Sequence, residues 1–151
     1  MSHTCSSLLS HCVWSTKHRE PLIKTELKPR LNSYMRTVIE NEGARLLFIN
    51  GVEDHVHLLL ELPLTLLIPD LIEKVKPTTT KWMNRTFPEL NNKFRWQAGY
   101  GAFSVGKSNM QAVINYIENQ EEHHKKMSYK EEYIGFLQAL GIPYDPNVIF
   151  D

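Results

Sequence analysis

Apolar residues recur along the chain with two periods, and the shorter period predicts four strands. Residues 5–14 (CSSLLSHCVW), 45–52 (RLLFINGV) and 55–62 (HVHLLLEL) are rich in β-forming residues. Residues 94–105 (FRWQAGYGAFSV) also favour a strand, with a glycine-marked distortion that we interpret as a bulge. These runs are typical of strands that share one sheet.

The longer period predicts helices between the strands. Residues 25–42 carry apolar side chains at helical spacing, and Gly43 ends the run. Residues 69–86 also favour a helix, but Pro77 in its interior predicts a break near Lys76. The resulting order, β-α-β-β-α-β, predicts an α+β fold: a ferredoxin-like or RRM-like antiparallel sheet backed by two helices.

Two capping boxes predict appended helices after the last strand. The SNMQ run at 108–111 opens a helix that we expect over residues 108–126. The SYKE run at 128–131 opens a shorter helix that ends near Gly141. We therefore expect a tyrosine-bearing helix followed by a C-terminal tail at about 127–151.

The composition fits one globular domain over residues 1–151, with 42% hydrophobic and 23% charged residues. No segment approaches the roughly 18–20 apolar residues that a membrane span requires. The N-terminus lacks the pattern of a signal peptide. Cys5 and Cys12 stand seven residues apart in one strand-like run and would point to opposite faces. We therefore expect no disulfide between them, no membrane partner, and a reduced, cytoplasmic protein.

Charge is balanced over the whole chain but not along it. Seventeen basic side chains match seventeen acidic ones, which argues against a globally basic surface for nucleic acid. Residues 1–107 carry 14 basic and 10 acidic residues, whereas residues 108–151 carry 3 and 7. A basic face on the body is compatible with this split, and scattered solvated charges explain it equally well.

His55 and His57 form the first chemical signal. On a strand, residues i and i+2 share a face, with Cβ atoms roughly 7 Å apart. Two imidazoles can then converge on one divalent ion while Val56 points into the core. Two histidines do not complete a metal site, and two polar residues on a half-exposed strand are the alternative.

Tyr116 and Gln120 form the second signal, because residues i and i+4 share one helix face. That face borders the apolar arc of the predicted helix, where both side chains would face a site. A divalent metal can polarise a phosphodiester while a protein hydroxyl attacks it in line. Tyrosine suits this attack, since a phosphotyrosine retains the energy of the diester for rejoining. An amphipathic tyrosine at a helix–sheet seam and an ordinary surface glutamine are the alternatives.

In this order, the motifs resemble those of the HUH single-tyrosine transposases of bacterial insertion sequences and their REP-associated relatives. The resemblance covers nearly the whole chain. It runs through HCVWSTKHREPLI, GVEDHVHLLLELP, TTTKWMN, FRWQAGYGAFSVGKS, YIENQEEHHKKMSYKEEY and GIPYDPNVIFD.

The resemblance implies a metal-dependent, single-stranded DNA endonuclease and strand transferase that acts at hairpin-marked element ends. Tyr116 would be the nucleophile that forms a 5′-phosphotyrosine and frees a 3′-hydroxyl. His55, His57 and Gln120 would bind Mg²⁺ or Mn²⁺. Insertion-sequence members work as homodimers in which the tyrosine helix can complete the partner's site, while REP-associated members can act as monomers. We expect a homodimer on hairpin-containing single-stranded DNA, in the bacterial cytoplasm and nucleoid-associated.

Basic and aromatic residues are candidates for DNA contact, although each is individually explained as well by a solvated charge or a core aromatic. The candidates are Lys17, Arg19, Lys76, Lys81, Arg85, Arg95 and Lys107, with Trp82, Trp96 and Tyr100 as stacking partners.

Three residues near the predicted ligands have open roles. Asp54 would orient an imidazole from behind, or simply form the turn between two strands. His123 and His124 could compete as ligands or accept a proton. We expect them instead to form a polar helix end with the two lysines that follow.

Two other function classes stay open. A replication initiator or relaxase would use the same chemistry, but such proteins usually carry additional domains. An RRM-like module, or a REP-associated or domesticated protein, would bind hairpin DNA with little or no cleavage. Incubation with single-stranded oligonucleotides and Mg²⁺ or Mn²⁺ separates an enzyme of this chemistry from a binding module, because only the enzyme forms a covalent adduct.

Overall fold

The computed structural model describes residues 2–151 and contains one four-stranded antiparallel sheet. Strands β1 (Leu9–Ser15), β2 (Arg45–Val52), β3 (His55–Glu61) and β4 (Gly101–Val105) lie in the order β2-β3-β1-β4. Helix α1 (Lys28–Asn41) connects β1 to β2, and α2 (Ile68–Thr86) connects β3 to β4. This connectivity confirms the predicted ferredoxin-like α+β fold.

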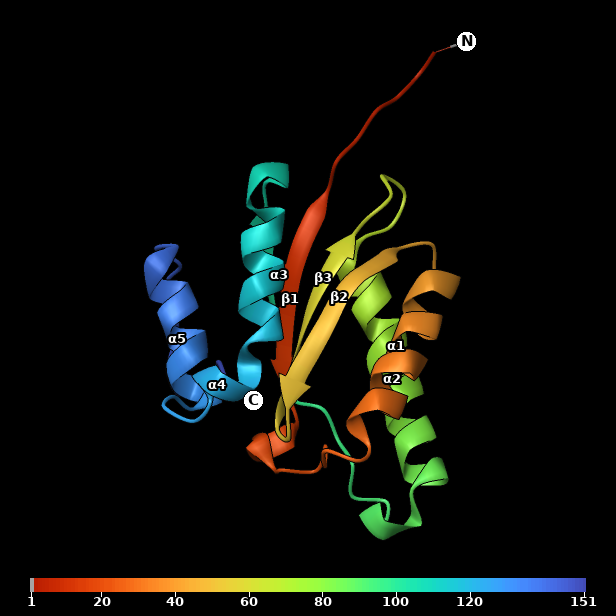
Figure 1. Cartoon of the computed structure of the whole chain (residues 1–151), viewed down its shortest axis with the longest axis vertical. Helices are drawn as coiled ribbons and strands as arrows, with labels where there is room; N and C mark the ends of the chain where they lie inside the picture. The colour runs from red at the N-terminus through yellow and green to blue at the C-terminus, as the bar shows by residue number, and fades with distance from the viewer. Residues whose placement is uncertain (1) are drawn as a thin grey trace.

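The sheet has helices on both faces (Figure 1). Helices α1 and α2 cover one face, where Trp14, Val56 and Leu58 belong to the larger apolar core. The other face carries α3 (Met110–Glu118), α4 (Gln120–His123) and α5 (Tyr129–Ala139). There Val13 and Phe103 of the sheet pack with α5 in a smaller core. Because neighbouring strand residues point to opposite faces, Val56 enters the first core and His55 and His57 face the second set of helices.

Helix α1 agrees closely with the sequence prediction. It begins with a proline in its first turn, where the missing N–H costs nothing. It ends before Gly43, whose φ of +98° is the left-handed conformation typical of a residue just past a helix.

Helix α2 is continuous through Pro77, so the predicted break near Lys76 is wrong. An interior proline costs a helix about 3 kcal/mol. Here the apolar stripe of the helix packs into the larger core and outweighs that cost. The packed residues are Leu71, Ile72, Val75 and Met83.

Strand β4 is shorter than the predicted run of 94–105, since only Gly101–Val105 pairs with β1. Trp96 makes one isolated bridge to Thr16, and the chain between leaves the sheet. The Lys76 ammonium donates to three carbonyls of that segment, those of Gln97 (2.9 Å), Ala98 (3.3 Å) and Gly99 (2.7 Å). These carbonyls therefore bond to a side chain instead of a neighbouring strand.

The helix predicted over 108–126 is divided. A 3₁₀ turn, η3 (Lys107–Asn109), precedes α3, and a break at Asn119 separates α3 from α4. Ser108 forms no cap, because the residue at the cap position is Asn109, whose side chain makes no capping bond. By contrast, the Ser128–Glu131 capping box forms and opens α5 as predicted.

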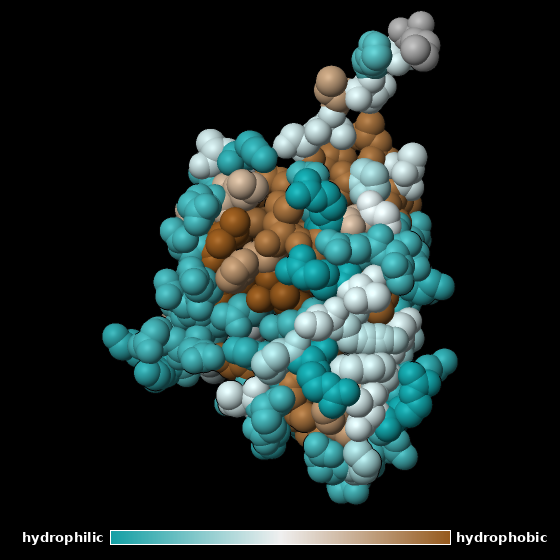
Figure 2. All heavy atoms as spheres, turned by 45° about the vertical axis from the view of Figure 1, so that its right-hand side comes forward, coloured by the Kyte–Doolittle hydropathy of each residue, from teal (hydrophilic) through white to brown (hydrophobic). Residues whose placement is uncertain are grey.

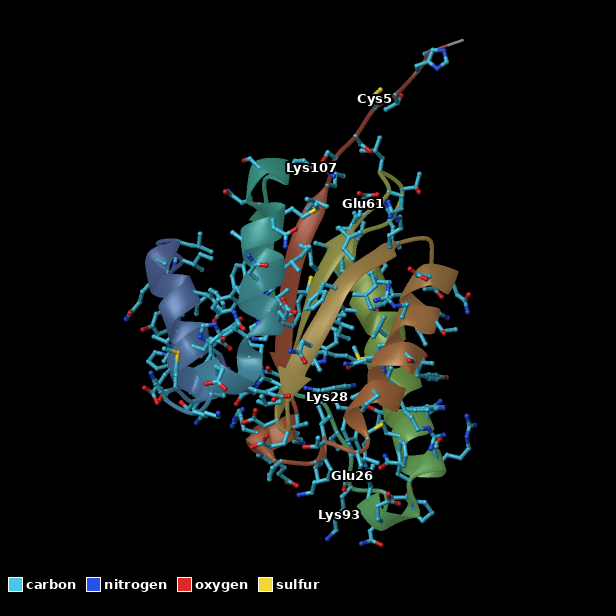
Figure 3. The ribbon with its side chains drawn as sticks, in the orientation of Figure 1. Cys5, Glu26, Lys28, Glu61, Lys93 and Lys107 are labelled. Carbon is cyan, nitrogen blue, oxygen red and sulfur yellow. The ribbon has the colours of Figure 1, made fainter. Side chains whose placement is uncertain are left out.

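Residues 2–8 run away from the body (Figure 1). β1 begins at Leu9, not at residue 5, and Cys5 lies on the projecting segment (Figure 3). Cys5 is exposed, Cys12 is buried, and neither forms a disulfide. Two further 3₁₀ turns, η1 (Lys17–Arg19) and η2 (Pro88–Leu90), complete the described elements. No helix within residues 2–151 is long and apolar enough to cross a membrane.

Some apolar surface stays uncovered. Figure 2 shows hydrophobic atoms gathered in the upper half of the face that it presents, bordered by hydrophilic atoms. Leu8, Leu64 and Leu67 remain exposed, and they line one hollow together with Leu62 and Ile68. Apolar patches of this kind are frequent at protein–protein contacts.

Candidate functional site

His55 and His57 project from β3 beneath α3, α4 and α5, and both are fully buried. Their ring centroids are 5.1 Å apart. The Nδ1 atom of His55 lies 2.7 Å from Oδ1 of Asp54, and Nδ1 of His57 lies 2.8 Å from Nε2 of His11 on β1. Each ring is therefore held from behind, with its Nε2 atom turned toward the C-terminal helices.

Tyr116 and Gln120 meet these two rings, so the structure brings the four predicted site residues together. Oε1 of Gln120 lies 3.0 Å from Nε2 of His55. The ring of Tyr116 lies 5.9 Å from that of His57, centroid to centroid. Although the helix breaks between them, Nε2 of Gln120 still reaches the Tyr116 carbonyl at 3.5 Å.

The helix break that positions Gln120 is stabilised from the sheet. The Asn50 amide donates to the carbonyls of Ile117 and Glu118, each at 3.1 Å, and so satisfies groups left free where α3 ends. Lys28 lies at the end of β2 (Figure 3), where its ammonium donates to Oδ1 of Asn50 at 2.9 Å and to Glu121 of α4 at 3.1 Å.

The hairpin formed by β2 and β3 requires a glycine opposite the start of β3. A Cβ atom on Gly51 would stand 2.1 Å from the carbonyl oxygen of His55, a distance that no side chain can occupy. Gly51 thus permits the close approach of β2 and β3 at the start of the histidine strand.

Glu132 is a site residue that the sequence analysis missed. It lies on α5 and is 4% exposed. Its Oε1 atom is 2.9 Å from Nε2 of His57, 3.2 Å from Nε2 of His124 and 3.5 Å from Nε2 of His55. A usable signal existed, because Tyr129, Glu132 and Tyr133 are spaced i, i+3, i+4 and so share the buried face of α5.

His124 also joins the site, contrary to the expected polar helix end. Its Nε2 atom lies 3.0 Å from Oε1 of Gln120, because the helix break turns the following residues inward. His123 packs its ring on Tyr116, with 4.6 Å between centroids. One ligand atom from each of His55, His57, His124 and Glu132 lies within 4.8 Å of the others.

Burial and hydrogen bonding set the charges of this cluster. Burial lowers the pKa of His55, but Asp54 and Glu132 outweigh it and raise that pKa to about 9. Burial lowers the pKa of His57 to about 4, against the opposing effect of Glu132. Burial would raise the pKa of Glu132, yet the hydrogen bonds to His124, His55 and His57 hold it well below its usual range.

The hydroxyl of Tyr116 donates to Oε2 of Glu132. Burial and this contact raise the pKa of Tyr116 above its ordinary value. At neutral pH the site therefore holds the ionised carboxylate of Glu132 beside the protonated hydroxyl of Tyr116. The donor set of imidazole nitrogens, an amide oxygen and a carboxylate oxygen is one that a divalent metal ion accepts.

Contacts to the body fix α5 over the sheet. Oε1 of Gln97 accepts bonds from the backbone N–H of Ser15 at 2.7 Å and from the Tyr129 hydroxyl at 3.2 Å. The Arg19 guanidinium donates to the Phe150 carbonyl at 2.7 Å and lies 5.5 Å from the centre of its ring. The segment after α5 thus ties that helix to the loop after β1.

Three of the basic residues considered for DNA contact lie together. Lys81, Arg85 and Arg95 are exposed, and they line one hollow with Thr80, Asn84 and Asn92. Lys17 and Lys107 are also exposed. Lys107 lies near the start of α3, at the far end of that helix from α4 (Figure 3).

The remaining candidates are engaged within the fold. Lys76 bonds to the three carbonyls described above, and burial lowers its pKa to about 8. Trp96 is buried and donates from its indole nitrogen to the Thr79 hydroxyl at 2.8 Å. Tyr100 is half-buried, with its ring 5.5 Å from the Lys76 ammonium. Trp82 packs edge-on against Tyr34 of α1.

Comparison with known proteins connects the fold and the site to one family. The family described as IS200-like transposases matches residues 4–120. The chain is 28% identical to the transposase of insertion sequence element IS200 from Salmonella typhimurium over 148 residues, covering 95% of this chain and 90% of that protein. It is 26% identical to the ISDra2 transposase TnpA of Deinococcus radiodurans over 116 residues, covering 74% and 83%.

Solved structures show the same architecture. A crystal structure from Deinococcus radiodurans, put forward as a transposase, superposes with a TM-score of 0.66 at 27% identity, covering 80% of this chain and 95% of that one. A REP-associated tyrosine transposase bound to a REP hairpin superposes with a TM-score of 0.59 at 16% identity, covering 82% and 74%. At 16% identity, the match to the REP-associated transposase shows a shared fold.

Proposed function

The chain belongs to the family of IS200-like transposases, and from this premise we propose that it cuts and rejoins single-stranded DNA through Tyr116. The observation that carries the proposal is the convergence of the half-buried Tyr116 with the buried side chains of His55, His57 and Gln120. These side chains come from strand β3 and from helices α3 and α4, and Gln120 follows His55 by 65 positions in the chain. Their meeting is what a tyrosine nucleophile beside a metal site requires.

The proposed reaction exchanges one phosphodiester for another. The Tyr116 oxygen forms a bond to the scissile phosphorus while the bond from phosphorus to the 3′-oxygen breaks, and that oxygen takes up a proton. The products are a 5′-phosphotyrosine and a free 3′-hydroxyl. A 3′-hydroxyl then attacks the phosphotyrosine and releases Tyr116, so strands are rejoined without a nucleotide cofactor.

Packing contacts orient the side chain of Tyr116, the proposed nucleophile. The Tyr116 ring has four aromatic neighbours, with centroids 4.6 Å away for His123, 5.7 Å for Phe136, 5.9 Å for His57 and 6.3 Å for His11. These contacts limit rotation of the ring and direct its hydroxyl to Glu132. The hydroxyl therefore keeps its proton until a substrate phosphate approaches, and Oε2 of Glu132 is the acceptor beside it.

We propose that Nε2 of His55, Nε2 of His57 and Oε1 of Gln120 hold Mg²⁺ or Mn²⁺. When bound, such an ion supplies positive charge that polarises the scissile phosphate. Asp54 and His11 hold the two imidazoles by their Nδ1 atoms, which orients the Nε2 lone pairs toward the site.

The proposed substrate is hairpin-containing single-stranded DNA at the ends of a mobile element. The hollow lined by Lys81, Arg85 and Arg95 has the charge that phosphates require. A solved protein of the same fold is bound to a REP hairpin. We also propose that the chain works as a homodimer, and the exposed leucines described above are compatible with such a contact.

Substitution of the nucleophile tests the proposal. Tyr116→Phe removes one oxygen, and we expect the covalent protein–DNA adduct to disappear from a denaturing gel while hairpin binding on a native gel persists. Tyr34→Phe is the matched control, since Tyr34 packs on the opposite face of the sheet. An adduct that survives in Tyr116→Phe would contradict the assignment. A native-gel shift without any wild-type adduct would instead indicate a hairpin-binding protein.

A further inference from the structure

We infer that Glu132 of α5 is a carboxylate ligand of the bound metal. The inference rests on the proposed function, because it concerns the metal site formed by His55, His57 and Gln120. It extends that site beyond residues 4–120, the part of the chain that matches the family. The ligand set would then include a helix that this match does not cover.

The first support is the spacing of donor atoms around one oxygen. Oε1 of Glu132 lies 2.9 Å from Nε2 of His57, 3.2 Å from Nε2 of His124 and 3.5 Å from Nε2 of His55. Bonds of about 2.0–2.2 Å to a common ion place neighbouring ligands roughly 2.9–3.5 Å apart in octahedral or tetrahedral geometry. Oε1 of Glu132 therefore already stands at the separation of a neighbouring ligand from each of these imidazole nitrogens.

The second support is that the two carboxylate oxygens of Glu132 have different partners. Oε1 faces the imidazoles, whereas Oε2 accepts bonds from the Tyr116 hydroxyl and from Nε2 of Gln120 at 3.3 Å. One oxygen is thus directed at the metal site and the other at the nucleophile. A monodentate ligand of this kind would hold Tyr116 next to the ion.

The third support is charge. Glu132 is 4% exposed, and within residues 2–151 no lysine or arginine forms an ion pair with it. A buried carboxylate requires a compensating positive charge. A divalent ion bound beside Oε1 would supply that charge.

The fourth support is the fixed position of α5. The capping box at Ser128 sets where the helix begins. The Tyr129 hydroxyl is bonded to Gln97, and its ring lies 4.8 Å from that of His55. Glu132 follows Tyr129 by three residues, so the same anchor places its carboxylate over the histidines.

Titration of the full-length protein with Mn²⁺ by calorimetry tests the inference. We expect Glu132→Gln to raise the Kd for Mn²⁺ by at least about tenfold, a loss comparable to or larger than that from removing a group that supports a ligand. Glu118→Gln is the matched control, since Glu118 is an exposed glutamate on α3, and its Kd should equal that of the wild type.

The outcomes separate this inference from the proposed function. If the wild-type protein binds no Mn²⁺, the result contradicts the proposed metal site itself. A wild type that binds, with Glu132→Gln binding equally well, would overturn only the role of Glu132. Tighter binding by Glu132→Gln would also overturn it, since the carboxylate would then be competing with the ion.

A second variant distinguishes metal ligation from negative charge, and it still tests the inference if Glu132→Gln does not fold. Glu132→Asp keeps the negative charge but withdraws the oxygen by one methylene, so a ligand role predicts weaker Mn²⁺ binding than in the wild type. Wild-type affinity in Glu132→Asp would overturn the inference. Thermal unfolding of each variant in EDTA shows which variants fold without metal. If Glu132→Gln does not fold, the Asp variant decides.

Discussion

At the scale of single residues, the imidazoles of the site are engaged at both ring nitrogens. His57 meets His11 through Nδ1 and Glu132 through Nε2. His55 meets Asp54 through Nδ1 and Gln120 through Nε2. A ring bonded on both sides cannot rotate without losing a contact in a dry environment, where an unmet polar group costs about 1–3 kcal/mol. The histidine pair is therefore oriented before any ligand arrives.

His11 is the supporting residue whose removal tests this orientation. Burial lowers its pKa to about 3, so the ring is neutral and can pair with neutral His57. We expect His11→Phe to keep the packing against Phe103 and Phe136 but to weaken Mn²⁺ binding by about 10- to 100-fold. Calorimetric titration measures this change. His3→Phe, at an exposed position, is the control, and equal affinities in both variants would contradict the supporting role.

At the scale of elements, the sequence predicted strands β2 and β3 closely but missed features of α2 and α3 that depend on contacts with other elements. Strands β2 and β3 lie within one residue of their predicted bounds, because the β-rich runs that identify them are local. The end of α3 was missed because it depends on Asn50, a residue of another element that bonds to the last carbonyls. Likewise, only packing against the core explains a continuous α2 through Pro77.

The two serine motifs provide a test at this scale, because they look alike in sequence and differ in structure. Ser128 accepts a bond from the backbone N–H of Glu131 at 3.2 Å, whereas Ser108 caps no helix. We expect Ser128→Ala to lower the free energy of unfolding by about 1 kcal/mol. Ser108→Ala should leave it unchanged. Urea denaturation compares them, and equal losses would contradict the assignment of the cap.

At the scale of the whole molecule, the site is assembled from β1, β3 and all three C-terminal helices. The sequence located His55, His57, Tyr116 and Gln120, because spacing on a strand or helix reveals a shared face. The sequence left Glu132 unassigned, because its spacing with Tyr129 and Tyr133 indicates the buried face of α5 but not that this face packs against β3. The sequence reveals patterns within one strand or helix, but it does not reveal which strands and helices pack against each other.

A site that joins so many elements links metal binding to global stability. Mn²⁺ that binds only the folded chain should raise the free energy of unfolding by about 2.7 kcal/mol at a concentration 100 times its Kd. Thermal melts with increasing Mn²⁺ measure the rise, and EDTA should reverse it. An unfolding temperature that does not respond to Mn²⁺ would contradict the proposed metal site.

The distance along the chain between His57 and Glu132 also has a consequence for the newly made protein. Seventy-five positions separate the two residues. At a synthesis rate of about 5–20 residues per second, roughly 4 to 15 s pass on the ribosome between them. During that interval the histidines of β3 have no carboxylate opposite them. The site therefore matures only after all four strands of the sheet have been made.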